Sequence, residues 1–308
     1  MHKTRIISVP VIAFFAVFAI FTALIIGSNS AHAGPVTINL RSASPFAILS
    51  GTPNITDAGN ASVITGNVGL SPATGAGIGL TCSQVTGTIY SVDATGPLPC
   101  RVTNSPLLLT AKNNLTTAYN DAAGRTPVTT IPTELGGTTL VAGVYDSSST
   151  TFGITAGAGA LVLDGQNDPS SVFIFQAPFN GTGLNVNSGS TVTLTNGAQA
   201  CNVFWRVDTA AISTSATFVG TILALNSITV QNGSTINGRL LARNGNVTLI
   251  NDTITVPICA GNDTEDVVPG LPNTGLTGGQ YMFWGMVSLL MLALGSLIAF
   301  VTYKKRAQ

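Results

Sequence analysis

Gly220-Thr-Ile-Leu-Ala-Leu-Asn226 is the stretch that decides the fold, because Gly238-Arg-Leu-Leu-Ala-Arg-Asn244 repeats its pattern eighteen residues later without a gap. The neighbouring runs repeat as well: Ile228-Thr-Val230 matches Val247-Thr-Leu249, and Thr217-Phe218 matches Thr235-Ile236 and Thr253-Ile254. Each repeat therefore contains three short β-type runs, a pattern that predicts one coil of a three-sided β-solenoid. The coils of a solenoid stack in register at the inter-strand spacing of about 4.8 Å.

The first run of each repeat is apolar at consecutive positions, unlike the alternating runs that follow it. Its apolar pairs are Phe204-Trp205, Ile222-Leu223 and Leu240-Leu241. A strand that is apolar on both sides needs a cover on its outer side. We expect the cover to be an amphipathic helix at about residues 107–123, where apolar residues recur every three or four positions. Ser105-Pro106 predicts the N-cap of this helix and Gly124 its end.

The N-terminal residues predict a secretory signal peptide over residues 1–33. Lys3 and Arg5 precede an apolar run from Ile6 to Gly27, and Ala31-His32-Ala33 resembles a signal-peptidase site. We therefore expect an exported protein whose mature chain begins directly after this site.

The C-terminal residues resemble the LPXTG cell-wall sorting signal. Leu271-Pro-Asn-Thr-Gly275 precedes an apolar run from Met282 to Thr302, which is long enough to cross a bilayer, and a basic tail follows. The resemblance implies that a sortase cleaves after Thr274 and links the chain to peptidoglycan. The segments implied are a polar stalk at 261–270, the motif residues Leu271, Pro272, Asn273, Thr274 and Gly275, and a transmembrane helix with its tail at 276–308. The expected location is outside the cell, first held in the membrane and then covalently anchored to the cell wall of a Gram-positive-type bacterium.

The composition of the expected mature chain argues against catalysis. Residues 34–274 contain seven basic and twelve acidic side chains, a net charge of about −5, so no basic surface predicts binding to nucleic acid. The two histidines, His2 and His32, both lie in the predicted signal peptide. The mature chain therefore lacks the commonest general base and metal ligand, and it contains no Gly-x-Ser-x-Gly motif. We expect no enzymatic activity, no cofactor and no metal site.

Four cysteines, Cys82, Cys100, Cys201 and Cys259, lie in the expected mature chain. An even number of cysteines in an exported protein predicts disulfides, and four cysteines allow three pairings. We favour Cys82–Cys100, which closes a short loop, and Cys201–Cys259, which fixes the end of the fold.

From about residue 38 to residue 257 the sequence resembles the microbial ice-binding-like domain. The motifs that carry the resemblance are Phe46-Ala-Ile-Leu49, Leu115-Thr-Thr-Ala-Tyr-Asn-Asp-Ala-Ala-Gly124, Glu134-Leu-Gly-Gly137, Gly143-Val-Tyr145, Leu163-Asp-Gly-Gln-Asn-Asp-Pro169, Val172-Phe-Ile-Phe-Gln176, Gly197-Ala-Gln-Ala-Cys-Asn-Val-Phe-Trp205 and Gly238-Arg-Leu-Leu-Ala-Arg-Asn-Gly245. The resemblance implies a mostly β fold for a domain at residues 34–260. That fold is a right-handed discontinuous three-sided β-solenoid with one long α-helix alongside.

Two sets of outward hydroxyl side chains are candidates for contact with ice or another extended surface. Thr carries a methyl and a hydroxyl group on a stiff side chain, and a flat array of such groups can hold water near ice-like positions. One candidate face carries Ser213, Thr229 and Thr248, with interruptions at Ala210-Ala211 and Asn246. The other carries Thr217, Thr235, Thr253 and Thr255, extended by Thr191, Thr193 and Thr195.

Threonine also suits exposed strands that bind nothing, so two functional hypotheses remain. The leading one is a cell-wall-anchored ice-binding protein, either antifreeze or ice-adhesive, that acts through a flat Thr/Ser-rich face. The alternative is a non-enzymatic surface adhesin or structural cell-wall protein with the same fold and no ice activity.

The remaining polar candidates have structural explanations. Asp164 and Asp168 form the one close acidic pair of the domain, and they suit either a calcium loop or the capping of backbone amides in a turn. Arg206, Arg239 and Arg243 suit either an anion or carbohydrate site, or packing against the helix with bridges to acids such as Asp121 and Asp208.

Overall fold

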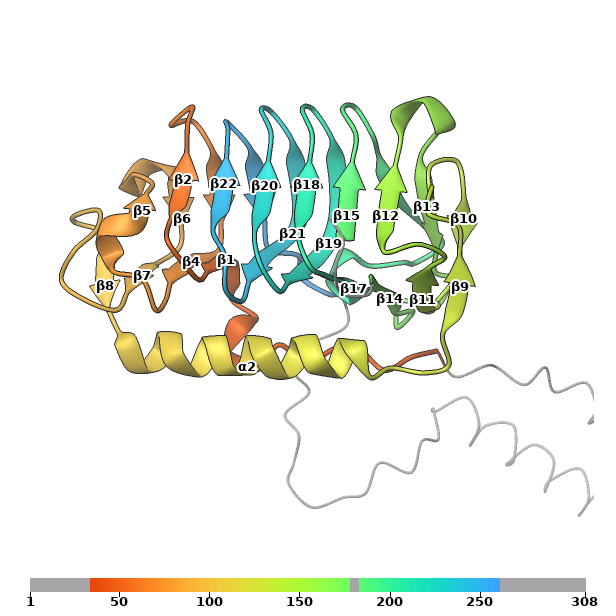
Figure 1. The fold of residues 1–308 in the computed structure, drawn as a ribbon, viewed down its shortest axis with the longest axis horizontal. Coiled ribbons are helices and arrows are strands. Elements are labelled where there is room, and N and C mark those ends of the chain that lie inside the picture. Colours follow the sequence, from red (N-terminus) through yellow and green to blue (C-terminus); the bar gives the residue numbers. More distant parts are fainter. Residues whose placement is uncertain (1–33, 178–182, 261–308) are drawn as a thin grey trace, which may run out of the picture. The chain divides into compact units, whose positions relative to one another are not determined.

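The computed structural model of the protein describes residues 34–177 and 183–260. The predicted signal peptide, polar stalk, LPNTG motif and transmembrane helix lie outside these residues. Among the described residues, no helix is long and apolar enough to cross a membrane. The described chain forms parallel strands stacked in coils, with helix α2 (Ser105–Ala123) running alongside (Figure 1).

The coils present three sides, which we call the helix side, face B and face C. The helix side contains β1 (Phe46–Ser50), β4 (Asn67–Leu70), β7 (Ile89–Ser91), β8 (Arg101–Thr103), β9 (Thr129–Ile131), β11 (Gly143–Ser147), β14 (Phe173–Gln176), β17 (Val203–Val207) and the second halves of β19 (Thr217–Ala224) and β21 (Thr235–Ala242). Face B is one sheet of β12 (Thr151–Ile154), β15 (Gly183–Val186), β18 (Ala210–Ile212), β20 (Ile228–Val230), β22 (Val247–Leu249), β2 (Ile55–Asp57) and β5 (Ile78–Gly79). Face C contains β10 (Thr139–Leu140), β13 (Leu161–Asp164), β16 (Val192–Thr195), the first halves of β19 and β21, β23 (Thr253–Thr255), β3 (Val63–Thr65) and β6 (Val85–Thr86).

Short 3₁₀ helices occur at several of the connections. They are η1 (Arg41–Ala43), η2 (Gly75–Gly77), η3 (Cys82–Gln84), η4 (Ala156–Ala158) and η5 (Ala200–Asn202).

The order of the coils in space differs from their order in the chain. The first strands pair with the last ones: β1 with β21, β2 with β22 and β3 with β23. From this contact, which we call the joint, the N-terminal coils continue to β8, and α2 then returns along the stack to β9 at the other end (Figure 1). The stack of coils is therefore discontinuous, and a helix flanks it.

One boundary of the repeat differs from the sequence prediction. The repeat predicts separate strands for the third run of one coil and the first run of the next, but the two form a single strand, Thr217–Ala224. The chain turns the corner at Gly220, whose φ is +115° and where a Cβ would lie 2.7 Å from Val203 Cγ1. Gly238 occupies the same corner on the next coil. Glycine therefore replaces the loop that other corners use.

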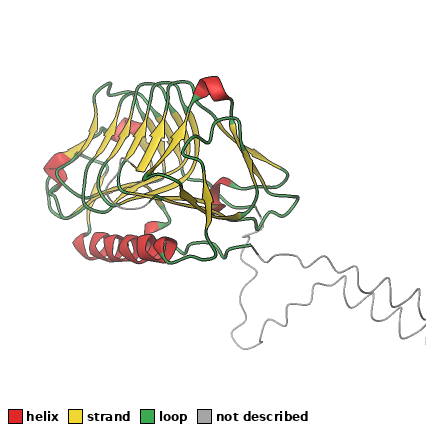
Figure 2. Ribbon diagram, turned by 45° about the vertical axis from the view of Figure 1, so that its right-hand side comes forward, coloured by secondary structure: helices red, strands yellow, loops and turns green. Residues whose placement is uncertain are grey.

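Helix α2 covers the doubly apolar strands, as predicted. One residue of each apolar pair, Phe204, Leu223 and Leu241, packs with Leu108, Leu115 and other buried residues of the helix. Figure 2 shows the helix lying against one side of the stacked strands.

The N-cap of α2 differs from the prediction. The side chain of Asn104 accepts from the Leu107 N–H, while Ser105 and Pro106 form the first turn. Asn104 provides the acceptor because it precedes the first turn, where helical amide groups lack partners.

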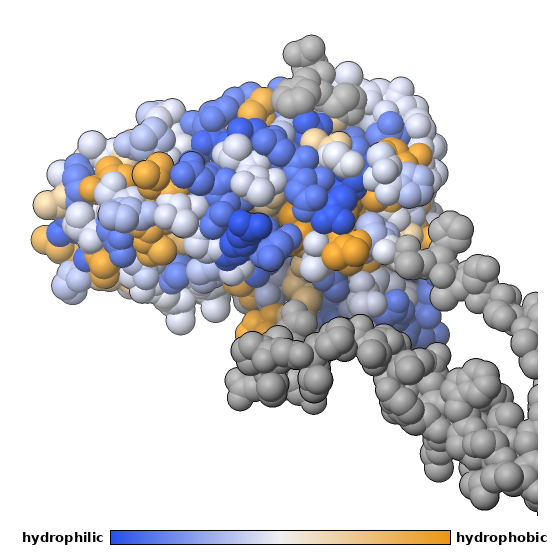
Figure 3. Space-filling view, turned by 90° about the horizontal axis from the view of Figure 1, so that it is seen from below, coloured by the Kyte–Doolittle hydropathy of each residue, from blue (hydrophilic) through white to orange (hydrophobic). Residues whose placement is uncertain are grey.

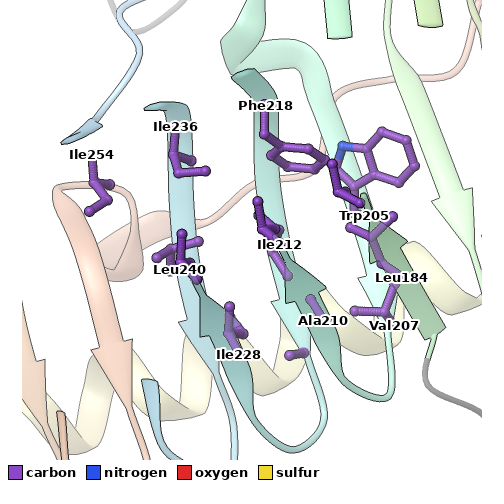
Figure 4. Close-up of a cluster of buried hydrophobic side chains, with 14 of the residues drawn as sticks. Leu184, Trp205, Val207, Ala210, Ile212, Phe218, Ile228, Ile236, Leu240 and Ile254 are labelled. Atoms are coloured by element: carbon purple, nitrogen blue, oxygen red, sulfur yellow. The ribbon is translucent and has the colours of Figure 1, made fainter. Parts of the chain in front are cut away.

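The interior of the solenoid is a second apolar layer. The other residue of each pair, Trp205, Ile222 or Leu240, lies in the core between the three sides. Figure 4 shows Trp205 and Leu240 among the buried side chains. Trp205 stacks on Phe175 with ring centroids 3.8 Å apart, and Phe152 meets both rings edge-on. Aromatic pairs add about 0.5–1.5 kcal/mol each beyond the area they bury.

The structure contains the disulfides Cys82–Cys100 and Cys201–Cys259, the pairing favoured above. The first closes a loop in the N-terminal coils. The second connects η5, between β16 and β17, to the last described residues of the chain.

Candidate functional site

Face B carries one uninterrupted rank of outward positions across its seven strands. The strand register aligns Gly153, Asn185, Ala211, Thr229, Thr248, Thr56 and Gly79. None of these side chains is charged, and none is larger than Asn. Because every strand of the sheet joins its neighbour in register, the rank repeats at the inter-strand spacing of about 4.8 Å.

The observed strand register puts a different residue in the place of one predicted member of face B. Ala211 stands opposite Thr229, while Ser213 follows two residues later on the same side of the chain. The sequence pattern groups Ser213 with the threonines because serine resembles threonine, whereas the buried apolar residues on either side of Ala211 set the register.

Thr56 is a residue of face B that the sequence analysis does not identify. It lies beside Thr248 because β2 pairs with β22 at the joint. A local signal is present, since Asn54-Ile-Thr56 matches Asn246-Val-Thr248 and Ser227-Ile-Thr229. Thr229, Thr248 and Thr56 therefore form three neighbouring threonines at the centre of face B.

Hydrogen bonds fix the position of the Thr248 hydroxyl. Asn246 Nδ2 donates to Thr248 Oγ1 at 2.9 Å, and Ser227 Oγ donates to Asn246 Oδ1 at 2.7 Å. Asn246, which interrupts the threonine pattern in the sequence, thus holds a threonine of the face in one rotamer.

Glu134 marks the end of the uncharged rank beyond β12. It forms an isolated bridge with Gly153, and its carboxylate accepts from the Gly136 N–H, the Thr155 N–H and Thr155 Oγ1. Partial burial acts to raise the pKa of Glu134, but these hydrogen bonds outweigh it and the pKa lies below its usual value.

Face C carries two ranks of residues aligned by the strand register. Thr217, Thr235 and Thr253 stand in register, and Thr191 joins them through an isolated bridge to Thr217. The second rank aligns Val219, Asn237, Thr255, Thr65 and Thr86. The remaining predicted residues, Thr193 and Thr195, lie on β16, where they pair with β13.

Face C is less continuous than face B. Val63 interrupts the first rank beyond Thr253, and Val219 in the second rank is buried. Within the described residues, the isolated bridge at Thr191 is the only strand-type pairing that links the β16 sheet to β19. The η5 segment contacts β19 and β21 and carries the Cys201–Cys259 disulfide.

Buried polar groups support the corner between faces B and C. Asp57 accepts from the N–H groups of Ser62 and Asn251 and from Gln84 Nε2. Asp252 accepts from the Ser234 and Ile250 N–H groups. The two carboxyl groups lie at the joint, one on each side of it.

The pKa values of the two carboxyl groups, Asp57 and Asp252, are shifted in opposite directions. Burial acts to raise the pKa of Asp57, but its hydrogen bonds outweigh burial and hold the pKa below its usual value. Burial, aided by the nearby charge of Asp57, raises the pKa of Asp252 to about 6.

The other acidic candidates have structural partners. Asp164 accepts from the Gln166 N–H and Asn196 Nδ2, and Asp168 accepts from the Ser170 N–H and Oγ, so both carboxylates act as turn caps. No group of His, Cys, Asp and Glu among the described residues is arranged to hold a metal ion.

The three candidate arginines pack at the helix side. Arg206 and Arg243 lie over the ring of Tyr119, and Arg239 donates to the Ser44 carbonyl. Asp121, one of the predicted acid partners, pairs instead with Arg125 at 2.8 Å, and the other, Asp208, accepts from Asn226 Nδ2. Figure 3 shows strongly hydrophilic and apolar residues mixed on this side, so it offers no uniform array like that of face B.

Comparison with known proteins identifies similarities over most of the chain. A family model described as ice-binding-like matches residues 48–255. An ice-binding protein of Colwellia sp is 44% identical over 242 residues, which cover 76% of this chain and 91% of that protein. An ice-binding protein of Flavobacterium frigoris (strain PS1) is 41% identical over 224 residues, 71% of this chain and 76% of that protein.

Solved structures share the fold. An ice-binding protein from an Antarctic biological consortium has a TM-score of 0.62 and 34% identity, covering 73% of this chain and 94% of its own. A domain of ice-binding protein 1 from Shewanella frigidimarina has a TM-score of 0.64 and 28% identity, covering 73% and 99% respectively. The mostly β fold of the described residues, with parallel strands and helix α2, is therefore similar to the folds of these proteins.

Proposed function

Because this chain belongs to the ice-binding-like family, we propose that it binds ice through face B as an antifreeze or ice-adhesion protein of the bacterial surface. The observation that carries the proposal is the uncharged rank from Gly153 to Gly79, in register across seven strands. The relatives are named for binding ice, so we propose binding and no catalysis.

The chemistry of face B suits ice better than a soluble ligand. Ice is a flat, repeating surface, and its recognition requires many weakly polar groups held at fixed spacings. Along the stack the groups repeat at about 4.8 Å, close to a repeat of ice lattice planes. The central Thr229, Thr248 and Thr56 supply methyl and hydroxyl groups on stiff side chains.

Face B is favoured over face C for two reasons. It is a single sheet in which every neighbouring pair of strands is hydrogen-bonded in register. Moreover, the described chain ends at the corner between face C and the helix side, where the Ala260 N–H donates to Gln199 Oε1 at 2.6 Å. That corner is opposite face B, so the described chain ends away from the strands that we propose to meet ice.

The proposal includes export and covalent attachment to the cell wall. It is supported by the order of the predicted signal peptide, the domain at 34–260, the stalk at 261–270, the motif Leu271–Gly275 and the apolar run with its basic tail. Sortase and peptidoglycan are then the partners during attachment, and the membrane holds the chain before it. On the cell, the protein acts as an ice adhesin or modifies ice at the wall.

Thermal hysteresis and ice recrystallisation inhibition of purified residues 34–274 test the ice-binding proposal. We expect faceted ice crystals and a measurable hysteresis gap that increases with protein concentration. A folded protein with no hysteresis at high concentration contradicts the proposal and favours the alternative, a non-enzymatic adhesin or structural wall protein that uses the same rigid fold.

A further inference from the structure

The C-terminal segment is attached to the fold in two ways that differ in mechanical strength: by the hydrogen-bonded strand β23, and by the covalent Cys201–Cys259 disulfide. After β23 the chain passes through the buried Pro257 to Cys259, which is bonded to Cys201. Ala260 follows directly, and it exchanges two hydrogen bonds with Gln199: its N–H donates to Oε1 at 2.6 Å, and Gln199 Nε2 donates to its carbonyl at 3.2 Å. Any pull on the chain beyond Ala260 therefore meets the disulfide before it meets β23.

The strands of the last coil, β22 and β23, are the ones least held in place by covalent continuity with their neighbours. β23 lies between β21 and β3, and β22 lies between β20 and β2. On one side of each strand, the neighbour belongs to the N-terminal coils and is attached by hydrogen bonds and packing, without a covalent connection at the joint. Withdrawal of β23 and then β22 removes two of the three strand pairs of the joint and leaves only β1 with β21.

Separation of the joint also divides face B. Thr248 lies on β22 and Thr56 on β2, on the two sides of the joint. Hydrogen bonds that cross the joint nearby include Ser50 Oγ to the Gly245 carbonyl at 3.1 Å and Thr52 Oγ1 to the Asn244 carbonyl at 3.0 Å. These are individual hydrogen bonds, which break one after another when a strand is withdrawn from one end.

Cys201 lies in a different mechanical environment. It is in η5, which leads into β17, and β17 is separated from β21 of the joint by β19. β17 pairs with β14 on one side and β19 on the other, and β16 pairs with β13. These neighbours follow one another in the chain, so a pull at Cys201 acts on the continuous part of the stack.

We infer that the Cys201–Cys259 disulfide is a mechanical latch, which transfers tension from the C-terminal anchor past the joint and into the middle of the solenoid. The inference rests on the anchorage proposed above. A cell held to ice through face B pulls on the C-terminus, and the latch makes this pull enter the fold at η5 rather than at β23 and then β22, the strand of Thr248. The two cysteines are 58 positions apart in the sequence, and the chain between them then carries no tension.

Single-molecule force spectroscopy tests the latch without ice or cell wall, so its outcome does not depend on ice binding or on sorting. Residues 34–274 are pulled between handles at the two ends. For the wild type we expect no step that withdraws the last coils. For Cys201→Ser/Cys259→Ser we expect an additional first step at a lower force than any wild-type step, with about 60 Å of extension for each coil of eighteen residues.

The second disulfide gives the matched control. Cys82→Ser/Cys100→Ser removes a disulfide in the N-terminal coils and leaves the Cys201–Cys259 attachment of the C-terminal handle intact. Both double variants lose thermal stability, but only the first acquires the low-force step. If the two variants give the same first step, or if Cys201→Ser/Cys259→Ser first yields at the wild-type force, the disulfide is a general staple and the latch is wrong.

A second measurement covers the case in which Cys201→Ser/Cys259→Ser does not fold. The folded Cys82→Ser/Cys100→Ser variant, whose remaining two cysteines form the latch, is held at a constant force below its first step while a reducing agent is added. Reduction of the latch should then cause stepwise extension by whole coils. A folded molecule that shows no such extension, although its thiols are afterwards found to be free, contradicts the inference.

Discussion

Thr56 and Thr248 stand in register on neighbouring strands of face B, although they belong to opposite ends of the described domain. The pairing exists because the N-terminal coils are placed against the last coil of the C-terminal part. It extends the threonine rank from Thr229 and Thr248 to a third member. The central part of face B is thus assembled across the joint, which makes the integrity of the joint a condition for the proposed ice binding.

A bulky side chain at the centre of face B should abolish ice binding without unfolding the protein. We expect Thr229→Tyr to remove thermal hysteresis, because a protruding ring lifts several neighbouring coils off a flat ice surface. Thr235→Tyr, at the centre of face C, is the matched control and should keep near wild-type hysteresis. Circular dichroism must first show that both variants are folded. Loss of hysteresis in Thr235→Tyr alone would assign the site to face C, and wild-type activity in both would exclude both centres.

The contact between helix and strands should tolerate no charge. Leu115 is fully buried between α2 and the strands, so Leu115→Asp should lower the free energy of unfolding by at least about 3 kcal/mol. Leu109 lies on the same helix and is 60% exposed, so Leu109→Asp should change it by only about 0.5 kcal/mol. Urea unfolding followed by circular dichroism measures both. Equal stability of the two variants would show that the helix does not pack as described.

Asp252 should make the domain more stable in mild acid than at neutral pH. Its pKa is raised to about 6 in the fold from an ordinary value of 3.8, so the folded state favours the neutral acid. The stabilisation is complete below about pH 4 and is lost as the pH rises through about 6, by about 1–3 kcal/mol after allowance for solvent screening. Asp57, with its lowered pKa, contributes stability that is lost only as the pH falls below about 4.

Thermal unfolding between pH 4 and pH 7 measures this dependence. Asp252→Asn should flatten it, because the amide carries no charge in either state. A wild-type domain whose melting temperature rises steadily across this range would contradict the assignment to Asp252.

The wall-linked protein should end at Thr274. Mass spectrometry of muralytic digests should find a C-terminal peptide that ends at this residue and is joined to a wall fragment. Deletion of Leu271–Gly275 should instead leave the protein in the membrane fraction or the medium. Recovery of Lys304-Lys305-Arg306 on the main cell-surface species would contradict sorting at this motif.

Local sequence patterns determined much of the architecture. The eighteen-residue repeat around Gly220 and Gly238 predicted stacked three-sided coils, and consecutive apolar residues such as Ile222 and Leu223 predicted a covering helix. These features are readable because strand alternation and helical periodicity are set by residues close together in the chain. The absence of histidine from the expected mature chain is likewise a property of the sequence alone.

Only the tertiary structure decided how distant segments meet. The pairing of β2 with β22 brought Thr56 into face B, and the register placed Ala211 rather than Ser213 beside Thr229. The sequence does not determine these contacts by any local period, because a pairing between segments far apart in the chain depends on packing and backbone hydrogen bonding over the whole domain. The same holds for the attachment of Cys259 to the corner opposite face B: the cysteine count predicted a disulfide, but only the stacked coils fixed the corner at which the described chain ends.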